Sequence, residues 1–203
     1  MPRARARPPK PRSSYHHGDL RDALLEAALS LLGQVGTSAL SLREVARVAG
    51  VSHAAPAHHF GDKAGLLTAL ATRGFERFLA AQRAAADRAS ERSKRLSWTG
   101  WAYVMFASEQ PAYFSLMFRP ELLRVSDPDF EAASRAAYEF LLDCVREASG
   151  ETTDQEVLRL RATAAWSHAH GLATLWLDGS LKEYTQATDL DKLARQLFGL
   201  PRL

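Results

Sequence analysis

Between Ser41 and Phe60 the sequence carries the pattern of two short helices joined by a tight turn. Ser41 has the side chain of a helix N-cap, and Glu44, three residues later, completes a Ser-x-x-Glu capping box. Gly50 follows the first apolar segment at a position that suits a left-handed C-cap, and Ser52 is placed to cap the second helix. This spacing predicts a helix-turn-helix, in which the second helix enters the major groove of DNA. Any corner between two helices also needs a cap, a glycine and apolar residues, so the bare pattern leaves that simpler interpretation open.

The residues on either side of this unit narrow the choice. They are Ala46, Gly50-Val51-Ser52, His59-Phe60, Asp62-Lys63 and Leu66-Leu67, preceded by the helical segment YHHGDLRDALLEAALSLL and by Gly33 and Gly36. In this order they resemble the DNA-binding domain of TetR-family regulators. The resemblance is close over residues 15–70 and looser over the rest of the chain.

The resemblance implies an all-α fold, with an N-terminal three-helix DNA-binding domain and a C-terminal helical bundle for ligand binding and dimerisation. We expect a disordered basic arm over residues 1–14, the helix-turn-helix domain over 15–62 and the C-terminal domain over 63–203. No apolar run approaches the ~20 residues that span a bilayer. The single cysteine leaves no internal disulfide. These features fit a cytoplasmic protein with no membrane partner.

The N-terminal arm concentrates positive charge. It holds Arg3, Arg5, Arg7, Lys10 and Arg12 and no acidic residue, out of 26 basic residues in the chain, whereas all 23 acidic residues lie elsewhere. A cationic arm therefore precedes a mildly acidic body, and its prolines keep it from forming a helix. The arm is either a solvated tail or a segment that neutralises DNA phosphates and enters the minor groove.

The second helix of the unit, expected from Ser52 to about His59, has few long side chains for reading bases. Ala57 stands where family members often carry a tyrosine that reaches a phosphate, and Pro56 restricts the start of the helix. Arg43, near the start of the preceding helix, is the best candidate for a strong guanine or phosphate contact. Direct reading of bases is therefore expected to be sparse, with DNA shape contributing more. The predicted DNA-binding residues are Arg3, Arg5, Arg7, Ser41, Arg43, Ser52, His53, Ala54, Ala55, His58 and Lys63.

Apolar spacing predicts further helices over residues 19–34, 62–88, 128–149, 154–177 and 189–198. The helix over 62–88 would join the DNA-binding part to the rest, so a shift at its far end would move the second helix of the helix-turn-helix. Cys144 is expected to be a small core residue.

Aromatic side chains and methionines crowd the span from Trp98 to Phe118. Such a run is often plain core, but together these residues also suit a pocket for a mostly apolar molecule. Glu109 and Arg119 could orient that molecule or face water. With two residues of a later helix, the predicted ligand-binding residues are Trp98, Trp101, Tyr103, Phe106, Tyr113, Met117, Trp166 and His170.

Trp166, His170 and Gly171 resemble the Trp-x-x-x-His-Gly signature of one C-terminal subfamily of TetR regulators. Trp166 and His170 are four residues apart and so share a helix face. His170 either contacts a ligand or forms a hydrogen bond within the bundle. In the family, two C-terminal helices of each subunit form a four-helix dimer interface. The alternative is that these apolar helices cap the core of a monomer.

These observations predict a ligand-responsive transcriptional regulator, a repressor released from a pseudo-palindromic operator when a small, largely apolar molecule binds. The expected partners are double-stranded operator DNA, the effector and a second copy of the chain, with no cofactor, metal or catalytic residue. An enzyme is disfavoured because no phosphate-binding glycine loop, Gly-x-Ser-x-Gly elbow or His-Glu-x-x-His motif is present. A third possibility is a helical ligand-binding protein whose helix-turn-helix contacts another protein.

Overall fold

In a computed structural model, residues 17–150 and 154–201 are described, and in these ranges the protein is all-helical with no strand. The prediction of an all-α fold is confirmed. The helices are α1 (His17–Ala39), α2 (Leu42–Ala49), α3 (Ala55–Phe60), α4 (Lys63–Ala86), α5 (Arg95–Glu109), α6 (Pro111–Met117), α7 (Pro128–Ala148), α8 (Gln155–Leu177), α9 (Ser180–Thr185) and α10 (Leu190–Leu197). Two short 3-10 helices, η1 (Arg92–Lys94) and η2 (Pro120–Leu122), precede α5 and follow α6.

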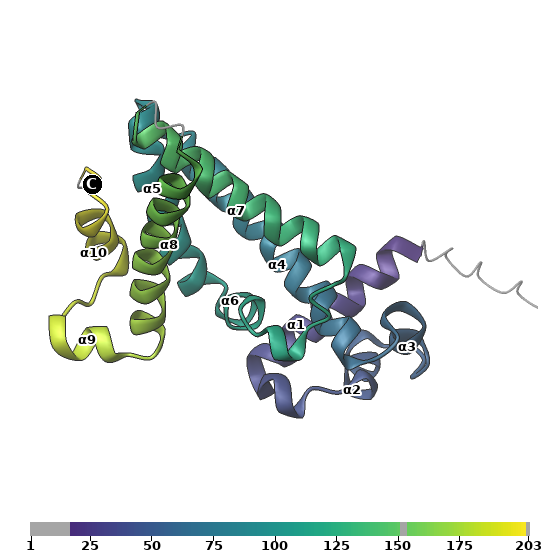
Figure 1. The fold of residues 1–203 in the computed structure, drawn as a ribbon. Coiled ribbons are helices and arrows are strands. Elements are labelled where there is room, and N and C mark those ends of the chain that lie inside the picture. The colour runs from purple at the N-terminus through teal and green to yellow at the C-terminus, as the bar shows by residue number, and fades with distance from the viewer. Residues whose placement is uncertain (1–16, 151–153, 202–203) are drawn as a thin grey trace, which may run out of the picture.

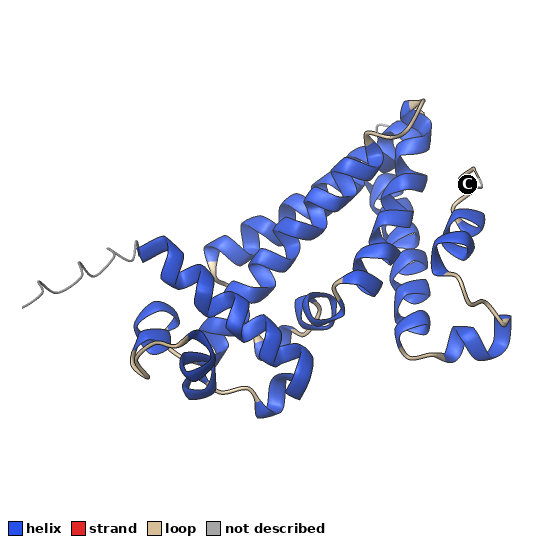
Figure 2. Cartoon of the chain, turned by 180° about the vertical axis from the view of Figure 1, so that it is seen from behind, coloured by secondary structure: helices blue, strands red, loops and turns tan. Residues whose placement is uncertain are grey.

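The helices form two groups that share one long helix. α1, α2 and α3 cluster around the start of α4, while α4 and α7 run side by side away from this cluster (Figures 1 and 2). α5 and α8 pack at the far end, and α9 and α10 lie on the outer side of α8. α4 therefore spans from the helix-turn-helix to the C-terminal bundle, as the sequence predicts.

The first half of the helix-turn-helix forms as expected. The Ser41 hydroxyl accepts a hydrogen bond from the backbone N–H of Glu44 at 3.2 Å. Gly50 ends α2 in the left-handed conformation, with φ of 69°. The helix expected over residues 19–34 continues through Gly33, and its helical geometry breaks at Gly36, where φ is 71° and ψ is 177°. Of the two glycines expected to end this helix, Gly36 does so and Gly33 does not.

The predicted start of the second helix is also wrong. α3 begins at Ala55, its N-cap is Ala54, and no side chain caps it. Ser52 instead uses its backbone carbonyl, which accepts a hydrogen bond from Ala55 N at 3.0 Å. Pro56 explains the shift, since proline fits the first turn of a helix, where its missing N–H needs no partner. α3 is thus a six-residue helix with a buried proline at its start.

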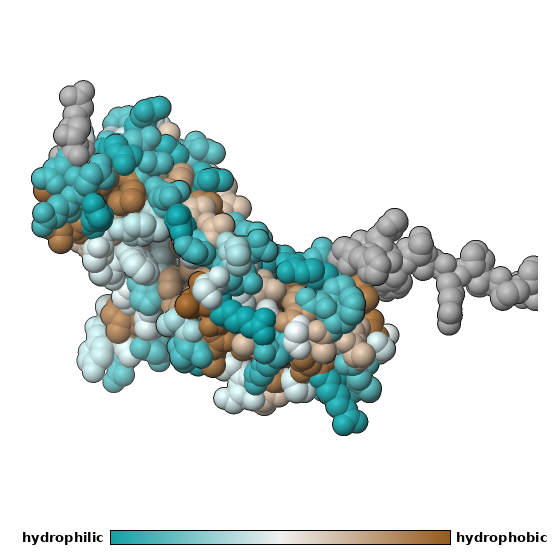
Figure 3. Space-filling view, turned by 45° about the vertical axis from the view of Figure 1, so that its right-hand side comes forward, coloured by the Kyte–Doolittle hydropathy of each residue, from teal (hydrophilic) through white to brown (hydrophobic). Residues whose placement is uncertain are grey.

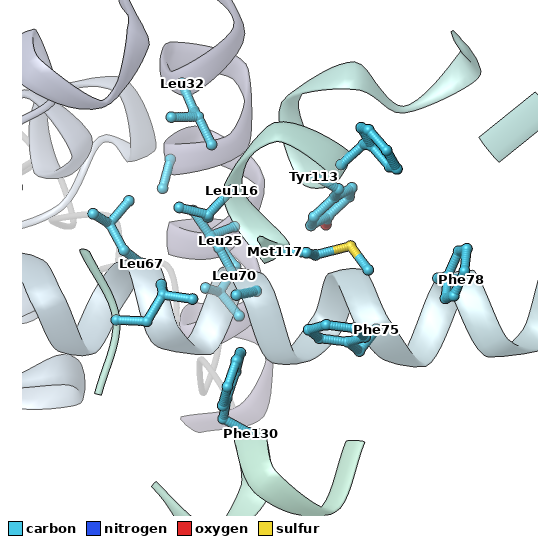
Figure 4. Close-up of a cluster of buried hydrophobic side chains, with 14 of the residues drawn as sticks. Leu25, Leu32, Leu67, Leu70, Phe75, Phe78, Tyr113, Leu116, Met117 and Phe130 are labelled. Carbon is cyan, nitrogen blue, oxygen red and sulfur yellow. The ribbon is translucent and has the colours of Figure 1, made fainter. Parts of the chain in front are cut away.

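The core runs without a break from the N-terminal cluster into the bundle. Figure 4 shows side chains of α1, α4, α6 and α7 meeting around the first half of α4. The labelled residues are Leu25 and Leu32 of α1, Leu67, Leu70, Phe75 and Phe78 of α4, Tyr113, Leu116 and Met117 of α6, and Phe130 of α7. One contiguous core stabilises both parts. A movement of α6 or α7 therefore changes the side-chain packing around α1.

The C-terminal segment contains a helix that the sequence pattern missed. α9 fills part of the stretch between the two predicted helices, and it is mostly exposed. α10 docks on α5, where the Trp101 indole N–H donates to the Asp191 carboxylate at 2.7 Å. The buried Arg195 pairs with the same carboxylate at 2.8 Å within α10. Its guanidinium carbon lies 5.4 Å from the ring centroids of Trp98 and Trp101, which adds a second contact between α10 and α5.

The surface is mixed in character. On the face shown in Figure 3, hydrophilic residues predominate and apolar residues are visible as separate patches. In the described ranges, no helix is long and apolar enough to cross a membrane.

The junction between α3 and α4 depends on Gly65. A Cβ atom there would overlap the Phe60 carbonyl oxygen, which is backbone and cannot yield. We expect Gly65→Ala to lower the free energy of unfolding by about 1–3 kcal/mol, measured by urea unfolding. Gly33→Ala is the matched control, because a Cβ at that position meets no atom within 4 Å. It should raise stability by about 0.5–1 kcal/mol, and an equal effect of the two changes would contradict the steric explanation.

Candidate nucleic-acid interface and ligand cavity

The exposed side of α2 carries two arginines in different electrostatic states. Arg47 donates to the Glu44 carboxylate at 2.9 Å, and this hydrogen bond holds the pKa of Glu44 below its ordinary value. Arg43 is exposed and forms no ion pair with any described residue. Arg43 is therefore the cation of α2 that is available to an anionic partner.

The predicted DNA-binding residues of the turn and of α3 are mostly accessible. Ser52, His53, Ala54 and His58 are exposed, whereas Ala55 is half-buried. His59 is half-buried, and its ring lies 6.1 Å from the Phe60 ring centroid. The accessible side chains are short apart from the two histidines, so few groups can reach base edges.

The other five predicted DNA-binding residues have a structural role or lie outside the described residues. The Lys63 ammonium donates to the backbone carbonyl of Ser38 at 3.1 Å and so ties the start of α4 to the end of α1. The Ser41 hydroxyl is engaged as the cap of α2. The arm residues Arg3, Arg5 and Arg7 fall in residues 1–16, outside the described ranges.

An ion pair that sequence reasoning missed joins the helix-turn-helix to the C-terminal bundle. Arg124, in the loop before α7, pairs with Asp62 at 2.8 Å. The backbone N–H of Arg124 donates to the Thr68 hydroxyl on α4 at 2.9 Å. The pKa of Asp62 is held down first by its capping bond from the Gly65 N–H and then by Arg124. No local pattern marks this contact, because its partners lie far apart in the sequence.

A cavity of about 460 Å³ lies between α4, α5, α7, α8 and the end of α10. Its volume falls within the ~300–1,000 Å³ typical of small-molecule sites. The wall contains apolar, aromatic and polar side chains, among them the His168 imidazole, and no Asp, Glu, Lys or Arg. It is formed by Phe75, Phe78, Gln82, Leu96, Ser97, Thr99, Gly100, Tyr103, Phe118, Ser134, Ala137, Tyr138, Leu141, Ala165, Trp166, His168, Ala169, Leu197 and Phe198.

Of the eight predicted ligand-binding residues, Tyr103 and Trp166 line this cavity. The other six are Trp98, Trp101, Phe106, Tyr113, Met117 and His170, and the structure places them away from its wall. Trp98 and Trp101 face Arg88, whose guanidinium carbon lies 4.4 and 5.3 Å from their ring centroids. Phe106, Tyr113 and Met117 belong to the core. The wall also includes residues of α4 and α7 that were not predicted, because their apolar spacing cannot be distinguished from ordinary core packing.

Tyr103, Trp166 and His170 are joined by hydrogen bonds at the edge of the cavity. The Trp166 indole N–H donates to the Tyr103 hydroxyl at 3.1 Å, and that hydroxyl lies 2.8 Å from His170 Nδ1. Because an indole N–H only donates, the tyrosine hydroxyl accepts from Trp166, and the tautomer of His170 decides which of the two groups donates in the Tyr103–His170 hydrogen bond. Burial raises the pKa of Tyr103 and lowers the pKa of His170, so both remain neutral. The shared face of Trp166 and His170 is confirmed, and His170 has a hydrogen bond within the bundle.

Removing the Tyr103 hydroxyl leaves the indole and the imidazole without their partner. We expect Tyr103→Phe to lower the free energy of unfolding by about 1–2 kcal/mol at pH 7.5, measured by urea unfolding. Tyr138→Phe is the matched control, since Tyr138 also lines the cavity but its hydroxyl forms no described hydrogen bond. Equal losses in the two variants would contradict the account of the hydroxyl as a bridge.

Comparisons with known proteins agree with this geometry. Residues 24–70 match the family model described as "Bacterial regulatory proteins, tetR family", and residues 96–199 match "Tetracyclin repressor-like, C-terminal domain". The second match does not assign the chain to the Trp-x-x-x-His-Gly subfamily, which stays a prediction. A curated regulator, BetI of Rhizobium meliloti, is 51% identical over 49 residues, a match that spans 24% of each chain.

Solved structures share the whole fold. A protein of unknown function from Rhodococcus sp. RHA1 is 34% identical, with a TM-score of 0.76 and coverage of 93% of this chain and 96% of its own. The TetR-family regulator PfmR of Thermus thermophilus is 21% identical, with a TM-score of 0.65 over 87% of this chain and 94% of its own. FadR of Bacillus subtilis, solved with stearoyl-CoA, is 16% identical, with a TM-score of 0.68 over 88% of this chain and 95% of its own. The chain therefore belongs to the TetR family of bacterial regulatory proteins.

Proposed function

We propose that this protein is a ligand-responsive transcriptional repressor that leaves its operator when a small, largely apolar molecule enters the cavity. The observation that carries the proposal is the continuity of α4, which begins directly behind the helix-turn-helix and ends along the cavity wall. The family is one of regulators, which favours a non-enzymatic protein acting in the cytoplasm. That FadR of Bacillus subtilis was solved with stearoyl-CoA supports ligand binding by this fold.

In this proposal the DNA-binding domain covers residues 15–62 and the C-terminal domain 63–203, with α4 serving both. Arg43 binds a guanine edge or a phosphate. The exposed side chains of His53, just before α3, and His58, on α3, contact the groove. Phosphates are contacted by Ser41, Ser52 and Lys63. Ala54 and Ala55 contact base edges or thymine methyl groups. The arm with Arg3, Arg5 and Arg7 adds phosphate contacts, which compensates for the small number of cations on α2 and α3.

Release follows from linkage between the two sites. Asp62 caps α4 and is paired with Arg124, so the loop before α7 is bound to the residue that follows the α3–α4 turn. A ligand that spreads α7 from α4 would shift Arg124 and with it the orientation of α3. Such a ligand must prefer the conformation that does not fit the operator, because equal affinity for both conformations shifts nothing.

A homodimer would present two copies of α3 to a pseudo-palindromic operator. The face of α8 turned away from the bundle is built of small and apolar residues at helical spacing. Leu160, Ala164, Ser167 and Thr174 are exposed on it, and a Cβ placed on Gly171 meets no atom within 4 Å. Leu160 is 64% exposed. We propose that this face and α10 pair with the same elements of a second copy.

The DNA-binding proposal is tested by fluorescence anisotropy with DNA from the region upstream of the protein's own coding sequence. We expect tight, sequence-selective binding that weakens steeply between about 50 and 200 mM salt. Arg43→Ala should weaken operator binding about 10- to 100-fold, because one strong arginine contact is worth about 1–3 kcal/mol.

Arg47→Ala is the matched control on the same helix, since the Arg47 charge is already balanced by Glu44. It should change operator affinity by less than about threefold. Weak binding that is equal on all sequences would contradict a specific operator. DNA affinity that does not fall as the salt concentration rises would contradict an interface built on phosphate contacts. It would favour the alternative, in which the helix-turn-helix contacts another protein.

The dimer proposal is tested by sedimentation velocity at micromolar concentration. Ala164→Glu should convert the dimer to a monomer, because it buries a charge without a partner in the proposed interface. Ala132→Glu, on an exposed position of α7, is the control and should leave the dimer intact. A monomeric wild-type protein would contradict the proposal.

A further inference from the structure

We infer that Gln82 sets the ligand specificity of the cavity, which takes an uncharged, mostly apolar molecule carrying one hydroxyl or amide group held by this side chain. The inference rests on the proposed function, in that the cavity must be the ligand site. It adds the chemical class of the ligand and the residue that recognises it.

The charge of the cavity wall limits which ligands it can bind. No Asp, Glu, Lys or Arg lines the cavity, and the imidazole of His168 is part of its wall. The nearby Arg95 donates to both carboxylate oxygens of Glu147 at 2.9 Å, so its charge is already matched. A carboxylate or phosphate inside the cavity would lose its hydration without gaining a lysine or arginine as a partner. The wall thus favours an uncharged molecule.

The Gln82 side chain places an amide oxygen without a hydrogen-bond partner at the cavity wall. Gln82 lies on α4 with 3% of its surface exposed, and it forms part of the cavity wall. Its Oε1 atom is buried and accepts no hydrogen bond from the described residues. Buried side-chain amides are nearly always hydrogen-bonded, so an unpaired one in a cavity wall calls for a partner that enters the cavity.

The chemistry of that partner follows from the amide. A half-turn about the last side-chain torsion exchanges the carbonyl oxygen and the amino group of glutamine, so the side chain can accept or donate. The groups that satisfy either orientation are those that also do both, namely a hydroxyl or a primary amide. An ester or a halide can only accept a hydrogen bond, so it satisfies the donating orientation of the amide but not the accepting one.

A second polar group marks the neighbouring wall. Thr99 of α5 is also buried and lines the cavity, and the only described partner of its hydroxyl is the Cys144 sulfur at 3.5 Å. Burial raises the pKa of Cys144, so this partner is a neutral thiol and a weak one. The wall also contains the hydroxyls of Ser97 and Ser134 and the His168 imidazole, but most of its side chains are aromatic or aliphatic, with Phe75 and Phe78 on α4 beside Gln82. One polar end and an apolar body therefore describe the complementary ligand.

The test uses displacement of Nile red, an uncharged dye, by three eight-carbon probes: 1-octanol, 1-chlorooctane and octanoate at about pH 8, where the carboxylate is ionised. We expect the wild-type protein to bind 1-octanol at least ~10-fold more tightly than octanoate. In Gln82→Leu, the ratio of 1-octanol to 1-chlorooctane affinity should fall about 3- to 10-fold, because the leucine keeps the bulk but removes the hydrogen bond. Gln82→Leu should fold at least as stably as the wild type, since an unpaired buried amide is removed.

Leu141→Ala is the control variant, because Leu141 lines the same cavity without a polar group. It should weaken all probes together and leave their ratios unchanged. An alcohol-to-chloride ratio that is the same in the wild type and in Gln82→Leu would overturn the role of Gln82, as would octanoate binding tighter than 1-octanol. If no probe displaces the dye and Leu141→Ala has no effect, the cavity is not a ligand site. That result overturns this inference and the effector part of the proposed function, whereas operator binding is judged separately.

Discussion

The packing of α4 is the constraint on which the rest of the structure depends. The helix begins at the Asp62 cap, directly after α3, and half of its 24 residues are buried. It packs against α1, α3 and α6, and along α5 and α7. Because protein interiors are close-packed, such a helix moves as a unit and carries a displacement at one end to the other.

In the proposed function, this arrangement couples the cavity to a distant DNA-binding surface. The wall of the cavity includes Phe75, Phe78 and Gln82 of α4, while Asp62 at the start of the same helix is held by Arg124. In this proposal, a ligand between α4 and α7 changes two features that position α3. They are the orientation of α4 and the position of the loop before α7, which carries Arg124. The energy available for this shift is the difference in ligand affinity between the two conformations.

Much of the fold follows from local patterns in the sequence, whereas the site follows from contacts that local patterns do not encode. Ser41, Gly50, Asp62 and Asp154 are correctly predicted as helix boundaries, because caps depend on neighbouring residues. Ser52 is not a cap, since Pro56 moves the start of α3. The aromatic residues from Trp98 to Phe118 divide between core and cavity according to which helix lies opposite, and Arg124–Asp62 joins distant segments.

The central claim is that the cavity and the DNA-binding surface are thermodynamically linked. The most direct test is the affinity for operator DNA, measured by fluorescence anisotropy with and without 1-octanol at a concentration that fully displaces Nile red. The account predicts that operator affinity falls at least ~10-fold when the cavity is filled, a typical allosteric coupling. An operator affinity that is unchanged while the cavity is demonstrably occupied would contradict it.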